Sequence, residues 1–361
     1  MLTTILAVVL VLGGLIFFHE LGHFAVARWL GMGVSTFSLG FGPKLLKFTR
    51  GKTEYALSLV PLGGYVALVG ESDENELPEG FTREESFALR PAWQRLLVVA
   101  AGPIANILLA WLLCWALAFG WGTPVLQPVI GAVSNDSPAA RAGLVPGDRL
   151  LRINDQELQS WEAMSEAIAA SNGQAMRVEI ERSTGDATST TLHLSLTAER
   201  ASRKTIFGEE ETAWLIGIRA GNHVVTHPRG FFEAAWAGAT HTLDMVSLTW
   251  QSFVKLAQRV VPLDQVGGPI MIAQMVGEQA HAGLAGLLAL SALISINLGI
   301  LNLLPIPMLD GGTIVFCLWE ILFRRPVNAK VQEWAMRVGL ALLIGLMLLA
   351  TFNDVWRIFK S

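Results

Sequence analysis

Cysteine and charge are both scarce in this sequence. The only two cysteines among its 361 residues, Cys114 and Cys317, lie in or beside apolar stretches. They offer neither a disulfide framework nor a paired metal site. Charged residues make up 16% of the chain against 52% hydrophobic residues, and the mean hydropathy is +0.47. Soluble domains carry about 25% charged residues, so this composition indicates an integral membrane protein.

A basic surface is missing as well. The net charge is -4, the sequence pI is near 6.0, and no basic patch of the kind that binds nucleic acid stands out. Binding to a phosphate backbone depends on such a patch. We therefore do not expect nucleic acid among the partners of this protein.

Long apolar runs, in contrast, are abundant. Four of them are candidates for membrane spans, at about 2–30, 96–121, 284–304 and 334–352. About 20 residues of helix cross the ~30 Å of hydrocarbon in a bilayer. The last run is short, but Arg337 can snorkel and Trp334 can sit at the interface. The first run lacks a charged leading region and a small-residue cleavage site, so we interpret it as a retained span.

The basic residues predict how these spans are oriented. Lysine and arginine gather in 31–95 and 313–333, and few of them lie near the two termini. Cytoplasmic loops carry the excess of positive charge, so both segments are expected in the cytoplasm. The termini and the long segment between the second and third spans are then expected outside it. The sequence predicts a polytopic α-helical membrane protein with four transmembrane helices.

An H-E-x-x-H motif lies inside the first apolar run. His19 and His23 are one helical turn apart on one face, so both can bind one Zn²⁺. Glu20 lies beside them and is suited to take a proton from the attacking water. Ionisable groups at membrane depth usually mark a functional site. At 1.5 Å per residue, His19 lies about 26 Å along the helix from Leu2, nearer the expected cytoplasmic face.

Two histidines leave a zinc site short of a third protein ligand, and Asp310 is the best candidate. It stands in the run Asn302-Leu-Leu-Pro-Ile-Pro-Met-Leu-Asp310-Gly-Gly312. The prolines stop the helix, the glycines allow a tight turn, and such irregular backbone at membrane depth lines a protein cavity. A helix cap at the interface is the alternative role for Asp310. The topology favours the ligand, because the first and third spans bring Asp310 to the depth of His19.

The loop after the first span predicts a β-hairpin. Two β-like runs, Tyr55–Val60 and Tyr65–Val69, are separated by Pro61-Leu62-Gly63-Gly64. Its faces can reach the lipid boundary and its edge can pair with an extended substrate. An ordinary packed hairpin fits the pattern equally well. The acidic stretch 71–85 is interpreted as a solvated loop without a function.

The segment 127–200 has the composition of a small soluble α+β module. Strands are expected at 129–133, 149–153, 176–181 and 190–196, with helices from Ser137 and over 161–170. The stretch Ala142–Asp155 resembles a PDZ domain, which implies a peptide groove at Ala142, Gly143 and Leu144. The segment 201–283 predicts one strand at 214–220 and an amphipathic helix over 231–261. That helix is expected on the outer membrane surface, or packed against the PDZ-like module.

These motifs together resemble one family over essentially the whole chain. H-E-L-G-H, A-G-P-I-A-N at 101–106, a PDZ-like module and N-L-L-P-I-P-M-L-D-G-G are similar to the site-2 proteases, intramembrane zinc metalloproteases, and most to the bacterial RseP type. The resemblance implies one zinc ion on His19, His23 and Asp310, with Glu20 activating water. It further implies substrate contacts at Asn302, Tyr55, Leu57, Leu59, Gly64 and Tyr65. Asn106 faces the same cavity or bonds between helices.

The resemblance also implies partners and a location. Substrates are expected to be single-span membrane proteins of the anti-sigma-factor or remnant-signal-peptide type, already cut by another protease. The site would lie in the bacterial inner membrane, near its cytoplasmic face, with the PDZ-like module outside the cytoplasm. Well-known members have two PDZ modules, whereas this chain has room for one. The rival hypothesis is a non-catalytic PDZ-bearing adaptor with a structural metal site, which would not need Glu20.

Overall fold

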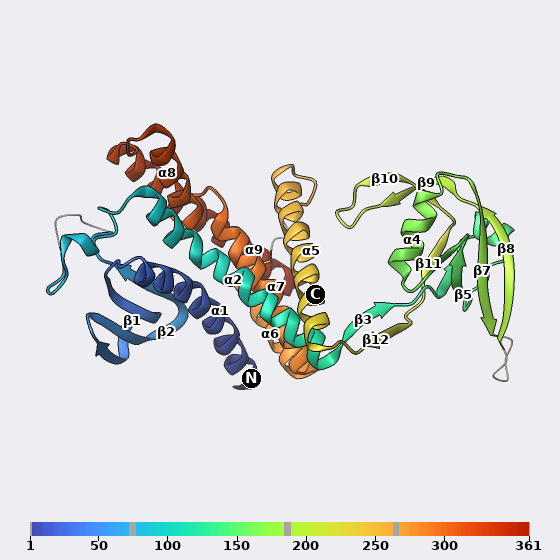
Figure 1. Ribbon diagram of the computed structural model, residues 1–361, viewed down its shortest axis with the longest axis horizontal. Helices are drawn as coiled ribbons and strands as arrows, with labels where there is room; N and C mark the ends of the chain where they lie inside the picture. The colour runs from blue at the N-terminus through green and yellow to red at the C-terminus, as the bar shows by residue number, and fades with distance from the viewer. Residues whose placement is uncertain (1, 72–76, 184–188, 263–266, 361) are drawn as a thin grey trace. The chain divides into compact units, whose positions relative to one another are not determined.

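The computed structural model describes residues 2–71, 77–183, 189–262 and 267–360. The chain folds as two compact units (Figure 1). One combines Met1–Leu117 with Phe232–Ser361 and is called the helical unit here. The other is Ala118–Phe231 and is called the β-rich unit. Each is described by itself below.

Within the part of the chain that the structure describes, four helices are long and apolar enough to cross a membrane. They are α1 (Leu2–Trp29), α2 (Ala92–Trp121), α7 (Leu284–Leu303) and α9 (Ala329–Lys360). Each falls on one of the predicted apolar runs, so the polytopic character of the chain is confirmed. The last helix differs most from its expected bounds, because α9 starts before 334 and continues through the expected tail 353–361 as far as Lys360.

The helical unit also contains further helices. Helix α5 (Phe231–Ala257) falls on the amphipathic helix expected over 231–261, whereas α6 (Pro269–Ala282), α8 (Asp310–Phe323) and the 3-10 turn η1 (Arg83–Glu85) were not predicted. The apolar run of the third span was expected at 284–304, and the element with its N-x-x-P motif was expected to reach 312, but α7 ends at Leu303. Asp310 is instead the first residue of α8, which occupies much of the expected cytoplasmic loop 313–333. The turn between them is thus a break between two helices.

Helix α6 packs against α1 and α7. Its fully buried Val276 lies in one hydrophobic cluster with Leu15 of α1 and Leu290 of α7. Its N-terminus is fixed by Asp354 of α9, whose carboxylate accepts hydrogen bonds from the backbone N–H groups of Gly268, Ile270 and Met271. These groups have no partner within their own helix, so a carboxylate there both satisfies them and complements the helix dipole.

Helix α5 was expected on the outer membrane surface or packed against the PDZ-like module, and the structure shows its contacts with other helices. It packs within the helical unit, where Trp111 of α2 donates to the Ala235 carbonyl at 3.0 Å and Thr249 donates to Asn297 of α7 at 3.2 Å. The buried positions of α5 are small residues on one face: Ala234, Gly238, Thr242 and Thr249. Small side chains allow two helices to approach closely, so α5 can pack on its neighbours although it has few large apolar residues on its buried face.

The β-structure after α1 differs from the predicted hairpin. It consists of β1 (Val34–Arg50) and β2 (Thr53–Leu68), and the turn between them lies at Gly51-Lys52. The two predicted runs do not pair with each other, because β1 lies between them: Phe37 pairs with both Tyr55 and Val66. Strand β1 was not predicted from the sequence, because Gly40, Gly42 and Pro43 interrupt the alternation of apolar and polar residues along it. The sheet lies against α1 (Figure 1).

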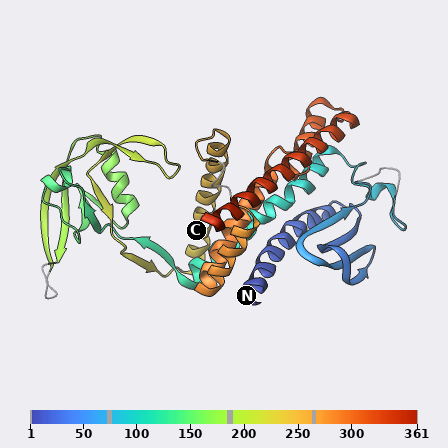
Figure 2. The ribbon, with the colours of Figure 1, turned by 180° about the vertical axis from the view of Figure 1, so that it is seen from behind.

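The β-rich unit contains a four-stranded sheet and three two-stranded ones. Its strands are β3 (Thr123–Leu126), β4 (Ile130–Val133), β5 (Arg149–Ile153), β6 (Gln156–Glu157), β7 (Ala175–Ser183), β8 (Ser189–Thr197), β9 (Glu199–Lys204), β10 (Glu210–Leu215), β11 (Ile218–Ala220) and β12 (Val224–His227). Helices α3 (Pro138–Arg141) and α4 (Trp161–Ala170) complete it. The larger sheet has the order β6-β5-β7-β8, and α4 packs beside the strands (Figure 2).

The expected module 127–200 is too short at its C-terminal end. Strand β11 pairs with β4, and Ile216 is part of the same hydrophobic core as Leu150 and Ile180. The single strand expected at 214–220 is split into β10 and β11 at Gly217, whose φ of +80° favours glycine. The unit therefore includes residues that the sequence pattern left outside the module.

A buried ion pair anchors the loop before β5. Asp148 is fully buried, and its two oxygens accept hydrogen bonds at 2.7 Å from Nε and Nη2 of Arg182 on β7. The same carboxylate accepts from the Val145 N–H at 2.9 Å. Arg182 also donates to the Gly143 carbonyl, so one guanidinium holds both ends of the loop.

We expect Arg182→Met to destabilise the β-rich unit. Without the guanidinium, the Asp148 carboxylate stays buried without its cation, which costs about 2–4 kcal/mol in opening free energy. Hydrogen–deuterium exchange of β5 and β7 in the intact chain measures this loss. Arg203→Met is the matched control, because Arg203 pairs with Glu211 at the surface and should change protection by less than about 1 kcal/mol. Equal effects of the two variants would contradict the role of the buried pair.

Candidate active site

The site is built where α1 and α2 come unusually close. A Cβ atom on Gly22 would lie 2.3 Å from the Ala101 carbonyl oxygen, and one on Gly102 would lie 2.2 Å from Nε2 of His23. Only glycine at both positions allows this helix approach and leaves room for the imidazoles. In the predicted motif at 101–106, Gly102 therefore matters because it has no side chain, which leaves space for the two imidazoles.

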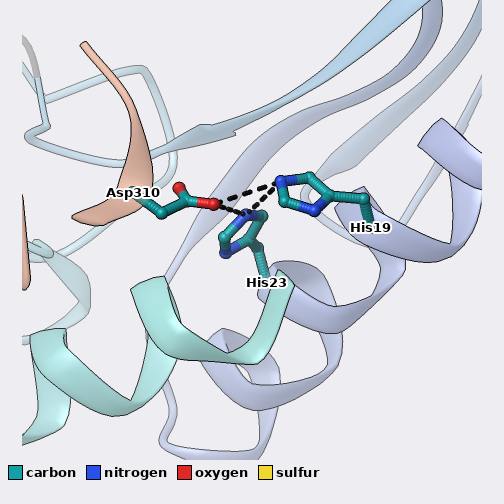
Figure 3. Close-up of side chains that lie close together, drawn as sticks. All are labelled: His19, His23 and Asp310. Carbon is teal, nitrogen blue, oxygen red and sulfur yellow. Dashed lines mark hydrogen bonds and ion pairs between the residues drawn. The ribbon is translucent and has the colours of Figure 1, made fainter. Parts of the chain in front are cut away.

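Two imidazoles and one carboxylate converge in this space (Figure 3). The Nε2 atoms of His19 and His23 are 3.2 Å apart, and the Asp310 Oδ2 atom lies 3.2 Å and 3.6 Å from them. Ligand atoms about 2.1 Å from a tetrahedral zinc ion are separated by about 3.4 Å. The three atoms therefore have the spacing of a zinc-ligand set, with room for a fourth ligand.

Hydrogen bonds orient the two histidines for this role. His23 Nδ1 lies 2.8 Å from the Val98 carbonyl oxygen, which only accepts, so this nitrogen carries the proton and leaves the Nε2 lone pair free. His19 Nδ1 lies 3.1 Å from the side-chain amide of Asn106, whose Oδ1 is buried without a partner. Turning that amide over lets Oδ1 accept from His19 Nδ1–H. Both imidazoles then direct a lone pair at the centre.

Asp310 provides the negative charge, and its own Oδ2 is buried without a hydrogen-bond donor. The preceding turn fixes its position: Met308 has a φ of +84°, and the turn leaves no room for side chains after Asp310. A Cβ on Gly311 would lie 2.0 Å from the Leu304 carbonyl oxygen, and one on Gly312 2.7 Å from that of Ile306. An orphaned carboxylate oxygen between two lone pairs fits a bound cation.

The three residues open onto a cavity of about 500 Å³. Glu20 lines it next to the histidines, and its carboxylate accepts a hydrogen bond from the Val66 backbone. Asn302 lines it from α7, with its side-chain nitrogen 3.4 Å from His19 Nε2. A proton-accepting carboxylate and an amide thus both face the place where a substrate carbonyl would meet the cation.

The structure separates the predicted substrate contacts into two groups. Gly64 and Tyr65 line the cavity, and a Cβ on Gly64 would lie 3.2 Å from Cγ of Glu20. Tyr55, Leu57 and Leu59 are not among the lining residues. The Tyr55 ring stacks on Phe48, 5.1 Å away, while Leu57 and Leu59 are exposed on the sheet. These three side chains therefore lie outside the cavity, and their contact with a substrate stays a prediction.

Asn106 matches the second of the two roles expected for it. Its side chain is fully buried and is not among the residues that line the cavity. It instead bonds His19, while its backbone carbonyl accepts from Ser295 of α7 at 2.7 Å. The expected interhelical hydrogen bond is confirmed, because the side chain bonds His19 of α1 and so orients a candidate metal ligand.

The predicted PDZ groove residues belong to the β-rich unit. Leu144 is 3% exposed within the hydrophobic core, so its side chain does not line an open groove. Gly143, at a φ of +80°, forms the turn whose carbonyl binds Arg182. Ala142 packs against the same core. These positions contribute to a turn and to the core, and their role in binding a peptide stays a prediction.

Two residues of this site were missed from the sequence. Gly102 was quoted only as part of a motif, although a glycine facing two histidines in a neighbouring helix signals close packing. Glu71 was assigned to a solvated loop, yet it lines the cavity. Its place directly after the second β-like run was the available signal. Residues 72–76 of that acidic stretch lie outside the described part of the chain.

We expect Gly102→Ala to weaken zinc retention by about 10- to 100-fold, the range found when groups that orient metal ligands are disturbed. The added methyl group must displace His23 or push α2 away from α1. Zinc content per purified chain after dialysis against a weak chelator measures the effect. Gly120→Ala is the control on the same helix, because no atom lies within 4 Å of the added Cβ. Retention equal to that of the control would contradict the proposed packing constraint.

Comparison with known proteins is consistent with this geometry. Residues 7–346 match the model of Peptidase family M50. A protein of Agrobacterium fabrum is 37% identical over 96% of this chain and 94% of its own. The regulator of sigma-W protease RasP of Bacillus subtilis is 30% identical over 99% of both chains, and the zinc metalloprotease RasP of Bacillus licheniformis is 29% identical over 99% of this chain and all of its own. This chain therefore belongs to peptidase family M50, the site-2 proteases, and is a membrane zinc metalloprotease.

Proposed function

We propose that this protein hydrolyses peptide bonds within or near the membrane span of single-span membrane proteins, as a step of regulated intramembrane proteolysis. The observation that carries the proposal is the position of the ligand set. Both histidines and Glu20 lie on α1, which is long and apolar enough to cross a membrane. A substrate bond that reaches them must leave the lipid and enter a polar cavity.

One zinc ion per chain fits the single ligand set found among the described residues. When bound, it polarises the scissile carbonyl and lowers the pKa of the attacking water. Glu20 takes the proton from that water as its oxygen attacks the carbonyl carbon. Glu20 then gives the proton to the amine nitrogen as the C–N bond breaks. Asn302 donates its amide N–H toward the oxygen on which negative charge develops.

The substrate backbone is held as an extended strand along the Gly64–Leu68 end of β2. This end lies at the margin of the sheet, because its pairing partners are residues of β1 on one side only. It also borders the cavity and contacts Glu20. A helical substrate has no free backbone groups, so the span unwinds before it pairs with this edge.

The remaining assignments follow from this reaction. The protein lies in a bacterial inner membrane with its centre near the cytoplasmic face, as the basic segment 31–95 supports. The β-rich unit is PDZ-like and lies outside the cytoplasm, where it selects pre-cleaved substrates by their new carboxyl terminus or by their size. Anti-sigma factors and remnant signal peptides are substrates of this description.

We expect Glu20→Gln to reduce cleavage of a single-span reporter by about 10²- to 10⁴-fold, the usual contribution of a general base and acid. Zinc content should remain, because the substitution removes the proton acceptor and none of the three ligands. Reporter cleavage in reconstituted membranes and zinc content are measured together. Equal cleavage by the variant and the unaltered chain would reject the assignment of the reaction to this site.

We expect Asn302→Ala to lower kcat by about 10²-fold, because a donor aimed at developing charge contributes roughly this much. KM and zinc content should change little. Asn297→Ala is the control on the same helix, since Asn297 bonds Thr249 and does not line the cavity. A fall in zinc content that matches the fall in rate would instead assign Asn302 to support of His19.

A further inference from the structure

Glu71 is a carboxylate in the catalytic cavity that the reaction above does not use. It follows β2 through Gly70, whose φ of +73° favours glycine, and its backbone N–H donates to the Leu68 carbonyl at 3.3 Å. This turn brings the side chain back to the cavity that contains His19, His23 and Asp310. Protein surrounds part of the residue, but enough of it stays accessible for a side chain from outside the protein to reach it. Glu71 is thus positioned by the same strand that borders Glu20.

The charge of Glu71 has no cationic partner among the residues that the structure describes. No lysine or arginine is among the described residues that line the cavity, and none of the described ion pairs includes Glu71. Surrounding protein displaces water from its carboxyl group and raises the pKa of Glu71, and the nearby Glu20 and Asp310 raise it further, although His23 and a backbone hydrogen bond at Leu68 oppose this. A cation from outside the chain would therefore stabilise its ionised form.

The proposed substrates carry such a cation at a predictable place. Residues that flank a membrane span on the cytoplasmic side are enriched in lysine and arginine. Glu71 lies just beyond the end of β2, in the basic segment expected on that side. A substrate strand paired with Gly64–Leu68 that continues past the end of β2 therefore passes Glu71 with its cytoplasmic flank.

We propose that Glu71 is a specificity-determining residue, which binds a lysine or arginine on the cytoplasmic flank of the substrate's span and so sets which peptide bond reaches Glu20. This proposal rests on the proposed function. It goes beyond it by naming the charge that the substrate must carry and the residue that recognises it.

A charge-exchange experiment with the full-length chain tests this pairing. Two single-span reporters that differ only in a lysine pair or a glutamate pair on the cytoplasmic flank are cleaved in liposomes of zwitterionic lipid. We expect the unaltered chain to prefer the lysine reporter by about fivefold in kcat/KM, as for a partly desolvated ion pair. Glu71→Gln should remove this preference, and Glu71→Lys should reverse it. Glu79→Lys, an exposed position in the same acidic segment, should leave the preference unchanged.

The outcomes separate this proposal from the proposed function. If neither reporter is cleaved, or Glu20→Gln cleaves as well as the unaltered chain, the protease assignment fails. If cleavage depends on Glu20 but Glu71→Gln keeps the full preference for lysine, Glu71 does not read the flank and the proposal is overturned. Cleavage of the glutamate reporter by Glu71→Lys, with zinc content intact, also shows that the variant is folded. If Glu71→Gln cleaves the reporter at a different peptide bond, this supports the proposal that Glu71 sets which bond of the substrate reaches Glu20.

Discussion

The convergence of two imidazole nitrogens and one carboxylate oxygen is the constraint on which the rest of the structure depends. Three acceptor atoms within 3.2–3.6 Å of one another repel unless a proton or a cation lies between them. The hydrogen bonds to Val98 and Asn106 use the other ring nitrogens, so protons are directed away from the centre. The arrangement therefore favours a metal ion over an internal salt bridge.

Bringing these groups together requires backbone geometry that few residues allow. Gly22 and Gly102 remove the side chains that would separate α1 from α2, and Gly311 and Gly312 do the same where α8 starts against the proline turn. Each glycine weakens its helix by roughly 1 kcal/mol relative to alanine, which packing against neighbouring helices must offset. The histidines are thus presented by rigid helices, whereas Asp310 is presented by a turn that two prolines restrict.

Different elements line the cavity around His19, His23 and Asp310. Strand β2 contributes Gly64, Tyr65 and the Val66 backbone on one side of the cavity, and α7 contributes Asn302 on another. A polar cavity of this size beside apolar helices accommodates a backbone that has lost its helical hydrogen bonds. Glu71 adds a carboxylate to the cavity, and none of the described residues that line it is a lysine or arginine. In our proposal this charge links recognition of the substrate's flank to the position of the scissile bond.

The sequence by itself determined the membrane class, the four long helices, the two ligand motifs and the family. These depend on apolar run length, helical periodicity and local motifs, which are properties of neighbouring residues. It also located most strands of the β-rich unit, since alternation and turn residues are local as well. It did not locate β1, whose glycines and proline hide its alternation, or α8, which follows a turn that ends the preceding helix.

Only the tertiary structure decided which side chains meet. The strand pairing that places 34–39 between the two runs of β2, the burial of Asn106 against His19 and the packing of α5 on α2 and α7 all join residues far apart in sequence. No local pattern encodes such contacts, because they arise from the shapes of two surfaces that pack together. Because such contacts are not local, the sequence pattern predicted a solvated loop at Glu71, whereas the structure places this residue in the lining of the cavity.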